Sequence, residues 1–188
     1  GGKGTRIRPV IGDVPKILAS VAGKPFLEWF LIWIKNWNLN FEFEILISTC
    51  IGHEQINEYC LKKNYNIKCI KEEKPLGTFG AIANVASQNY SKNYLVLNGD
   101  TIFKADFNMI FNSFKNHEEN LPLIILKEST TNERYGGYEN TDSGWIFSNK
   151  RTSYISMGAF FISHKSIKER WLKKTSINFD PIAINKQS

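Results

Sequence analysis

The stretch "YLVLNGD", residues 94–100, decides the fold. Its first four residues form an unbroken aromatic and apolar run, which is typical of a strand buried on both faces, and Asn98-Gly99-Asp100 is a tight-turn sequence. Upstream, strands are predicted at 43–49 and 67–72, with helices at 25–37, 53–63 and 81–88. This alternation predicts an α/β fold: a three-layer, Rossmann-like, mostly parallel sheet with helices on both faces.

Downstream of this stretch the alternation continues and then changes. A helix is predicted near 107–116 and a strand at 121–128. After Ser129 the sequence becomes rich in Gly, Tyr and Asn, which predicts a hairpin; a strand at 158–163 and a helix near 165–173 follow. The 188 residues are expected to form a single domain.

Composition narrows the classes of function. The net charge of +6 suits an anionic small molecule, and it would also suit nucleic acid. However, the sequence has no long basic run and no nucleic-acid-binding signature, so we expect no nucleic-acid partner. No apolar run approaches the ~20 residues of a membrane span. The three cysteines lack CxxC spacing, which favours a reducing, cytoplasmic setting over a disulfide framework or a zinc site.

The first nine residues, "GGKGTRIRP", combine three glycines with three cations. Glycine lets backbone N–H groups approach phosphate oxygens closely, and cations balance the phosphate charge. Two familiar phosphate loops do not fit this part of the chain. The dinucleotide fingerprint fails at Ile7, and the P-loop fails at Leu18 and Pro25.

Three motifs together carry a family resemblance: "GGKGTRIRPVIGDVPKILASVAGKP" (1–25), "EEKPLGTFGAI" (72–82) and "LNGDT" (97–101). Over about residues 1–165 the chain resembles the sugar-1-phosphate nucleotidylyltransferases, and within them the bacterial D-glycero-D-manno-heptose 1-phosphate guanylyltransferases. The resemblance implies an Mg²⁺-dependent enzyme of surface polysaccharide synthesis. Such an enzyme moves a nucleotidyl group, here a guanylyl group, from a nucleoside triphosphate to a heptose or hexose 1-phosphate and releases pyrophosphate.

The resemblance also implies roles for the nucleotide-side residues. Backbone groups of Gly1, Gly2, Gly4, Thr5, Gly77 and Thr78 would contact the nucleotide. Arg6 would bind the triphosphate and the leaving pyrophosphate, and Lys16 would lie at the α-phosphate or the incoming sugar phosphate. Asp100 would be the magnesium ligand. At Gly80 the thymidylyl branch of the family has a glutamine that meets the pyrimidine; glycine leaves room, which favours a purine.

On the sugar side the match is looser. Gly136 in "RYGG" and Lys150 in "FSNK" match family positions that face the sugar and its phosphate. Asn149 stands where the family has a glutamate for a sugar hydroxyl, and Ser156 where Asn is usual. The resemblance divides the domain into a nucleotide-binding half, 1–128, and a sugar-binding half, 129–188.

Both ends of the chain fall short of the family pattern. The family has an apolar central strand before the glycine loop, so we expect such a strand ahead of Gly1. A second magnesium-binding aspartate is expected beyond Ser188, and Asp180 is not that ligand.

Other readings stay open at this point. A catalytically inactive homologue that binds sugar nucleotides or regulates a partner would suit Asn149, and a thymidylyl, uridylyl or cytidylyl transferase would share the motifs. The 25–37 helix has a first apolar stripe, which is expected to face the sheet and is formed by Phe26, Leu27, Phe30, Leu31 and Ile34. A second stripe, formed by Trp29, Ile32 and Trp33, could be covered by a second copy in a homodimer.

Overall fold

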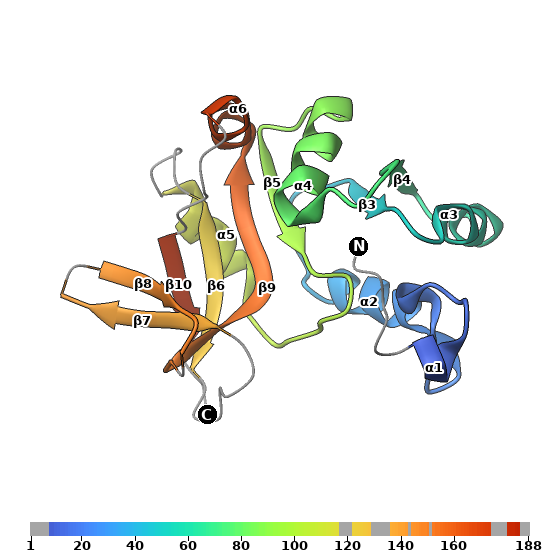
Figure 1. The fold of residues 1–188 in the computed structure, drawn as a ribbon, viewed down its shortest axis with the longest axis horizontal. Coiled ribbons are helices and arrows are strands. Elements are labelled where there is room, and N and C mark those ends of the chain that lie inside the picture. The colour runs from blue at the N-terminus through green and yellow to red at the C-terminus, as the bar shows by residue number, and fades with distance from the viewer. Residues whose placement is uncertain are drawn as a thin grey trace. The chain divides into compact units, whose positions relative to one another are not determined.

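The computed structural model describes residues 8–116, 122–128, 136–142, 144–150, 152–173 and 180–184. The chain forms two compact units, Gly1–Tyr90 and Ser91–Ser188, and each is described by itself. Figure 1 shows the ribbon with its elements labelled. Among the helices of the described ranges, none has the length and apolar character needed to cross a bilayer.

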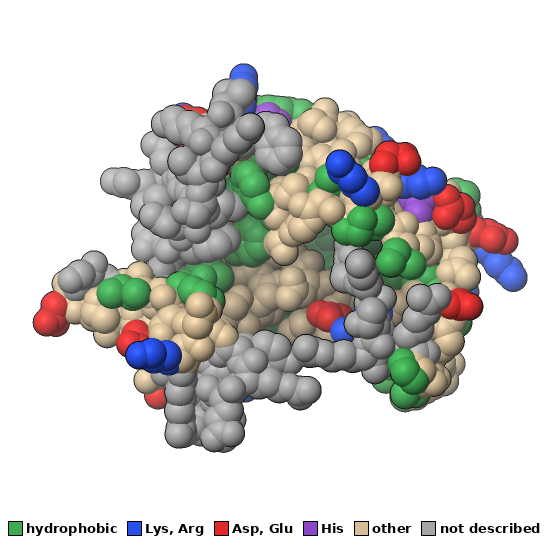
Figure 2. All heavy atoms as spheres, viewed as in Figure 1, with side chains coloured by type: hydrophobic (Ala, Val, Ile, Leu, Met, Phe, Trp, Pro, Cys, Tyr) green, Lys and Arg blue, Asp and Glu red, His purple; other side chains and the backbone are tan. Residues whose placement is uncertain are grey.

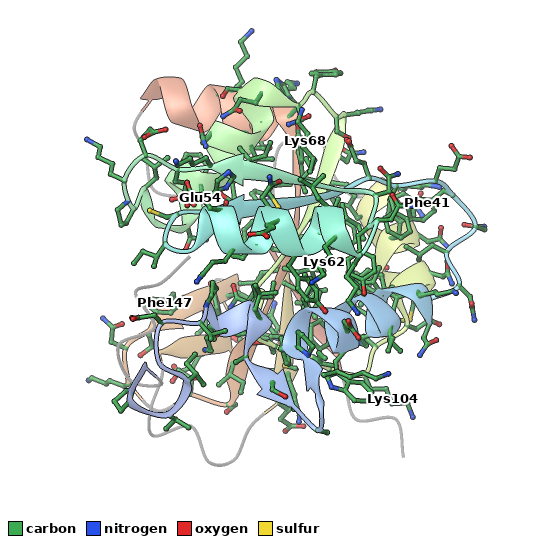
Figure 3. All side chains as sticks on the ribbon, turned by 90° about the vertical axis from the view of Figure 1, so that its right-hand side faces the viewer. Phe41, Glu54, Lys62, Lys68, Lys104 and Phe147 are labelled. Atoms are coloured by element: carbon green, nitrogen blue, oxygen red, sulfur yellow. The ribbon has the colours of Figure 1, made fainter. Side chains whose placement is uncertain are left out.

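In the first unit, two strands pair in parallel and a helix connects them. The elements are α1 (Arg8–Ile11), the 3₁₀ turn η1 (Lys16–Leu18), β1 (Ser20–Val21), β2 (Lys24–Pro25), α2 (Phe26–Lys35), β3 (Ile45–Thr49), α3 (His53–Lys62), β4 (Ile67–Lys71) and α4 (Gly77–Gln88). β3 and β4 pair from Ile45↔Ile67 to Thr49↔Lys71, so their carboxyl ends meet at one edge. Figure 3 shows α3 running in front of these strands, with Glu54 near its beginning and Lys62 near its end.

The first apolar stripe of α2 is buried inside the first unit, and the second is covered in part, with Ile32 41% exposed. Leu27, Phe30 and Ile34 are buried, as the first stripe predicted. On the second stripe, the Trp29 indole N–H donates to the Val21 carbonyl at 2.7 Å. Trp33 packs edge-on against Phe30, with ring centroids 5.1 Å apart. The β1–β2 turn and neighbouring rings therefore cover part of the stripe that could otherwise face a second copy.

Polar side chains line the rim, or outer edge, of the contact between α2 and α3. Glu28 accepts a hydrogen bond from the Tyr59 hydroxyl at 2.5 Å and pairs with Lys63 at 3.0 Å. The hydrogen bond from Tyr59, followed by that from Lys63, holds the pKa of Glu28 below its usual value. Beneath this rim, burial raises the pKa of Cys69 to about 12, so this residue is a neutral thiol near pH 7.

In the second unit, the long strand β9 organises the sheet. The elements are β5 (Asn93–Leu97), α5 (Phe107–Lys115), β6 (Leu123–Glu128), β7 (Gly137–Thr141), β8 (Gly144–Ser148), β9 (Tyr154–Ser163), α6 (His164–Lys173) and β10 (Asp180–Ile184). The strand order is β10-β6-β9-β7-β8, and β5 also pairs with β9. In Figure 1, β9 lies between β5 and β6.

The expected mostly parallel sheet is found only in part. Among the described residues β3–β4 and β6–β10 are parallel, whereas β9 is antiparallel to β5, β6 and β7. The described pairs also form separate sheets, not one sheet. The last five residues of β9 are buried, and a run that is apolar throughout looks the same in a parallel or an antiparallel setting.

The core of the second unit lies between α5 and this sheet. Ile110 of α5, Leu126 of β6 and Ile162 of β9 are fully buried. The ring of Phe114 stacks on that of Phe161, with centroids 4.9 Å apart. α5 begins at a capped end, because the Asp106 carboxylate accepts a hydrogen bond from the Met109 amide at 3.0 Å. This packing holds β6 and β9 in place, and β5 and β7, which lie next to candidate residues, pair with β9.

Candidate active site

The candidate residues fall in both units, so they are described as two half-sites. Lys16, Gly77 and Thr78 belong to the first unit, and Asp100, Gly136, Asn149 and Lys150 to the second. Gly1, Gly2, Gly4, Thr5 and Arg6 lie outside the described residues.

The segment that carries Lys16 packs on the β3–α3 turn through Pro15, the residue that precedes Lys16. Lys16 is exposed and begins η1, where the Leu18 amide donates to the Pro15 carbonyl at 2.8 Å. Gly52, the N-cap of α3, lies against Pro15, and a Cβ at position 52 would collide with the Pro15 ring. The φ of Gly52 is +76°, in the left-handed region that favours glycine. The β3–α3 turn thus supports the segment that carries Lys16.

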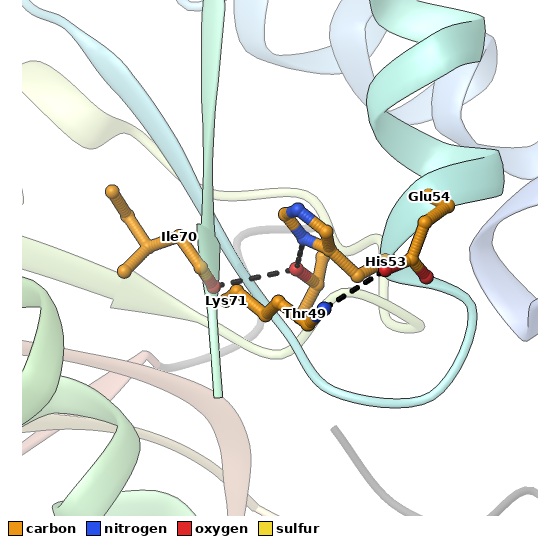
Figure 4. Close-up of polar contacts among 5 residues, drawn as sticks. All are labelled: Thr49, His53, Glu54, Ile70 and Lys71. Carbon is orange, nitrogen blue, oxygen red and sulfur yellow. Dashed lines mark hydrogen bonds and ion pairs between the residues drawn. The ribbon is translucent and has the colours of Figure 1, made fainter. Parts of the chain in front are cut away.

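Hydrogen bonds at the ends of β3 and β4 fix this β3–α3 turn (Figure 4). Thr49 is 3% exposed; its hydroxyl donates to the Ile70 carbonyl at 3.3 Å and lies 2.6 Å from Nδ1 of His53. The Lys71 ammonium donates to the Glu54 carboxylate at 2.9 Å. The first turn of α3 is therefore tied to both strands.

Gly77 and Thr78 lie at the start of α4, four residues earlier than the sequence predicted for this helix. Gly77 has a φ of +71°, and in the part of the chain that the structure describes no atom lies within 4 Å of the point where its Cβ would be. The first N–H groups of a helix have no partner within the helix, so they can bind anionic or polar ligand atoms. Open space beside a glycine at such a helix start allows a ligand to approach the backbone.

A residue that sequence reasoning missed, Glu72, shapes this turn. It is 3% exposed; one carboxylate oxygen accepts from the Ser48 hydroxyl at 2.8 Å and the other from the Leu76 amide at 3.1 Å. Burial acts to raise the pKa of Glu72, the hydrogen bonds from Leu76 and Ser48 are among the causes that lower it, and the pKa lies below its usual value. The sequence contained a signal that Glu72 is buried. Side chains alternate between the two faces of a strand, so position 72 lies on the same face of β4 as the buried Ile70.

Gly80 does not leave the open space that the sequence analysis ascribed to it. A Cβ at position 80 would lie 2.7 Å from Cβ of Leu76. The Leu76 side chain fills this space, so glycine is needed for close packing between the turn and the helix. The preference for a purine therefore gains nothing from Gly80.

In the second half-site, Asp100 follows the end of β5. The Asn98 amide donates to the Gly158 carbonyl of β9 at 2.7 Å, and the Thr101 amide closes the turn on the Asn98 carbonyl at 3.4 Å. Asp100 is exposed, and its carboxylate accepts from the Thr101 hydroxyl at 3.1 Å. The Asn98 side chain packs against Gly158, where β9 bulges. The turn is thus anchored to β9 and places Asp100 at an exposed position.

The base of the β7–β8 hairpin brings the sugar-side candidates together. Gly137 pairs with Ser148, so Gly136 lies beside the point where β8 ends and Asn149 and Lys150 follow. The Lys150 amide donates to the Ser148 hydroxyl at 3.1 Å, and a Cβ at position 136 would lie 2.6 Å from the Phe147 ring. Phe147 is 56% exposed, and Figure 2 shows hydrophobic side chains on the surface of this hairpin.

Strand register places the Asp100 turn and the hairpin base on the same side of β9. Tyr154 pairs with both β6 and β7, and the other end of β9 pairs with both β6 and β5. Since β6 occupies one edge of β9, β5 and β7 share the other. The end of β5 and the beginning of β7 both point toward residues 155–158, the edge segment of β9. Asp100 and Gly136 therefore border this segment from its two ends.

The donor set at Asp100 fits magnesium held jointly with a substrate. Within the described residues, no group of three or more His, Cys, Asp or Glu side chains could form a metal cage. Mg²⁺ is commonly bound by one or two carboxylates plus substrate phosphates. One exposed carboxylate at the carboxyl end of a strand suits that mode.

A nucleotidyl transferase family model matches residues 1–174, so the chain belongs to the nucleotidyl transferase family and is an enzyme of that class. It is 31% identical to a D-glycero-alpha-D-manno-heptose 1-phosphate guanylyltransferase of Aneurinibacillus thermoaerophilus, over 90% of this chain and 74% of that protein. The enzyme of the same name from Campylobacter jejuni is 36% identical, over 72% of this chain and 58% of the relative.

The fold agrees with a solved structure. The crystal structure of HddC from Yersinia pseudotuberculosis complexed with GMP-PN superposes with a TM-score of 0.77 at 25% identity, over 98% of this chain and 87% of that one. The α/β fold and the family membership that the motifs indicated are thereby confirmed.

Proposed function

We propose that this enzyme transfers the guanylyl group of GTP to the phosphate of a heptose 1-phosphate, or of a related hexose 1-phosphate. The products would be a GDP-sugar for surface polysaccharide synthesis and pyrophosphate. The observation that carries the proposal is the 31% identity, over 90% of the chain, to a heptose 1-phosphate guanylyltransferase. The open approach to Gly77 and the exposed position of Asp100 support it.

In the proposed reaction, an oxygen of the sugar phosphate attacks the α-phosphorus of GTP. A new P–O bond forms as the bond between the α-phosphorus and the bridging oxygen breaks, and pyrophosphate leaves with the electron pair. The enzyme forms no covalent bond, so its residues act by placing two anions together and offsetting their charge. Gly1, Gly2, Gly4, Thr5, Gly77 and Thr78 would hold the nucleotide.

The charged residues have separate tasks in this scheme. Arg6 would bind the leaving pyrophosphate, and Lys16 would place a cation at the α-phosphate. Asp100 would hold Mg²⁺, which supplies further positive charge to the phosphates when bound. Lys150 would bind the sugar phosphate, with Gly136 and Asn149 at the sugar. The choice of guanine rests on the relatives, because Leu76 fills the space beside Gly80.

A pyrophosphate-release assay tests the proposal. GTP, dTTP, UTP, CTP and ATP are each combined with Mg²⁺ and a panel of heptose and hexose 1-phosphates. We expect the highest kcat/KM with GTP and a heptose 1-phosphate. Faster pyrophosphate release with another nucleoside triphosphate would show that the enzyme transfers the nucleotidyl group of that nucleotide and not a guanylyl group. Nucleotide binding without release from any pair would identify an inactive homologue, the alternative that Asn149 suggested.

Lys150→Met tests the sugar half-site. Losing a charge-assisted contact to the sugar phosphate costs about 1.5–3 kcal/mol, so we expect KM for the sugar 1-phosphate to rise at least 10-fold. KM for GTP should stay within about 2-fold. Lys165→Met, at an exposed lysine of α6 at the other end of β9, serves as the control. Equal KM values in both variants and wild type would remove Lys150 from the site.

Gly52→Ala tests whether the β3–α3 turn positions Lys16. Alanine at a φ of +76° costs about 1–2 kcal/mol, and its methyl group must displace Pro15. We expect a lower Tm and a kcat reduced roughly 10-fold, because small displacements of a positioned group lower the rate strongly. Gly23→Ala is the matched control, since Gly23 has a φ of +80° and its added Cβ would meet no described atom within 4 Å. If Gly23→Ala lowers kcat equally, strain alone explains the loss.

A further inference from the structure

We propose that Glu72 is a positioning residue for nucleotide binding: its buried carboxylate sets the shape of the turn formed by Leu76, Gly77 and Thr78. The inference rests on the proposed function, in which this turn contacts the nucleotide. Glu72 itself is buried away from solvent and acts through the backbone of Leu76.

The position of Glu72 connects the strand pair to the turn. Its amide donates to the Thr49 carbonyl at 2.7 Å, which continues the β3–β4 pairing by one residue. Its side chain then reaches Ser48 of β3 with one oxygen and the Leu76 amide with the other. Glu72, at the carboxyl edge of the parallel strands, therefore fixes the position of the Leu76 backbone relative to β3 and β4.

Burying this carboxylate is costly, which indicates that its contacts matter. A charged group removed from water destabilises the fold unless hydrogen bonds compensate it. Leucine or methionine at position 72 would avoid that cost, but neither could accept a hydrogen bond from the Leu76 amide. What the carboxylate adds is a defined turn geometry.

The geometry that results is suited to a ligand. With its amide directed at Glu72, Leu76 packs its side chain against Gly80. Gly77 then adopts a φ of +71°, and no atom of the described residues lies within 4 Å of where its Cβ would be. The N-cap residue of α4, Leu76, gives this helix start no side-chain hydrogen bond. The first N–H groups of the helix are thus presented beside an open glycine.

Glu72→Gln is the decisive variant, with Glu73→Gln as its matched control. Glutamine keeps the size of the side chain and one acceptor oxygen, but it cannot accept hydrogen bonds from Ser48 and Leu76 with both terminal atoms. Glu73 is the adjacent, exposed carboxylate, so its replacement makes the same charge change one residue away. Ser48→Ala removes only the contact on the far side of Glu72.

The expected result is a separation of kinetic constants. We expect Glu72→Gln to raise KM for GTP, and Kd for GTP measured by calorimetry, about 10-fold. KM for the sugar 1-phosphate and kcat should change less than about 2-fold, because contacts made equally in ground and transition states affect KM alone. Ser48→Ala should give a smaller rise in the same direction, and Glu73→Gln no change.

A purely structural role gives a different pattern. It would lower Tm and the fraction of active enzyme, and hence kcat, while leaving KM and Kd for GTP unchanged; that outcome would overturn the inference. Wild-type enzyme that binds GTP but releases no pyrophosphate contradicts the proposed function alone, since Kd of the variants still reports on Glu72. Wild-type enzyme that binds none of the five nucleotides contradicts both.

Discussion

Replacing Lys16 with methionine is expected to lower kcat about 10³-fold. In the proposed reaction, negative charge develops around the α-phosphorus as the new bond forms, and a cation held there by Lys16 would stabilise the transition state more than the ground state. Removing one such group typically costs 10²–10³-fold in rate. Lys16 is exposed at the beginning of η1, so the variant should fold normally and keep its Tm within a few degrees.

Two further variants make the Lys16 result specific. Lys16→Arg keeps the charge but changes its shape, so it should recover part of the lost rate. Lys35→Met, at an exposed lysine of α2 in the same unit, should leave kcat unchanged. A Lys16→Met enzyme with kcat within 5-fold of wild type would exclude Lys16 from the catalytic residues. Initial rates of pyrophosphate release at saturating GTP and sugar 1-phosphate measure all three.

Asp100→Asn is expected to lower kcat about 100-fold, equivalent to about 2.7 kcal/mol of transition-state stabilisation. An amide keeps the shape of the side chain but loses the charge that attracts a divalent cation. The Mg²⁺ concentration for half-maximal rate should therefore rise as well. Because Asp100 is exposed and lies in a turn, its loss should change the free energy of unfolding by less than about 0.5 kcal/mol.

Asp106→Asn is the matched control for Asp100. Asp106 caps α5, and asparagine is an equally good N-cap residue, so kcat, the Mg²⁺ dependence and Tm should all stay near wild type. A Mg²⁺ titration of the initial rate compares the two variants. If Asp100→Asn shows the Mg²⁺ dependence of wild type, Asp100 is not a metal ligand.

Elements with strong local signals could be predicted from the sequence. α3 was expected at 53–63 and is observed at His53–Lys62, and the buried residues of α2 lie on the predicted stripe. α4 was expected to begin at Ala81 but begins at Gly77, because Pro75 and two glycines read as a turn. Residue propensities for secondary structure do not reveal the hydrogen bond that the Leu76 amide donates to Glu72 just before this helix.

Sequence motifs identified the candidate residues, but they did not identify the neighbouring residues that position them. Motifs named Lys16, Gly77 and Asp100, whereas the residues that hold the first two, Gly52 and Glu72, act through folding contacts. Ser48 and Glu72 are 24 positions apart, and they meet only because β3 and β4 pair in parallel. The antiparallel insertion of β9 was likewise invisible, since pairing direction depends on the topology of the whole unit.

The packing of Leu76 on Gly80 has a consequence for how nucleobase preference evolves in this enzyme. A glutamine at position 80, the residue expected in the thymidylyl branch of the family, would bring its Cβ to 2.7 Å from the Cβ of Leu76 in the present arrangement. Every residue except glycine carries that Cβ, so a side chain at position 80 requires either glycine at 76 or a shift of the turn. The two positions therefore form an epistatic pair: the cost of a substitution at 80 depends on the residue and the backbone at 76.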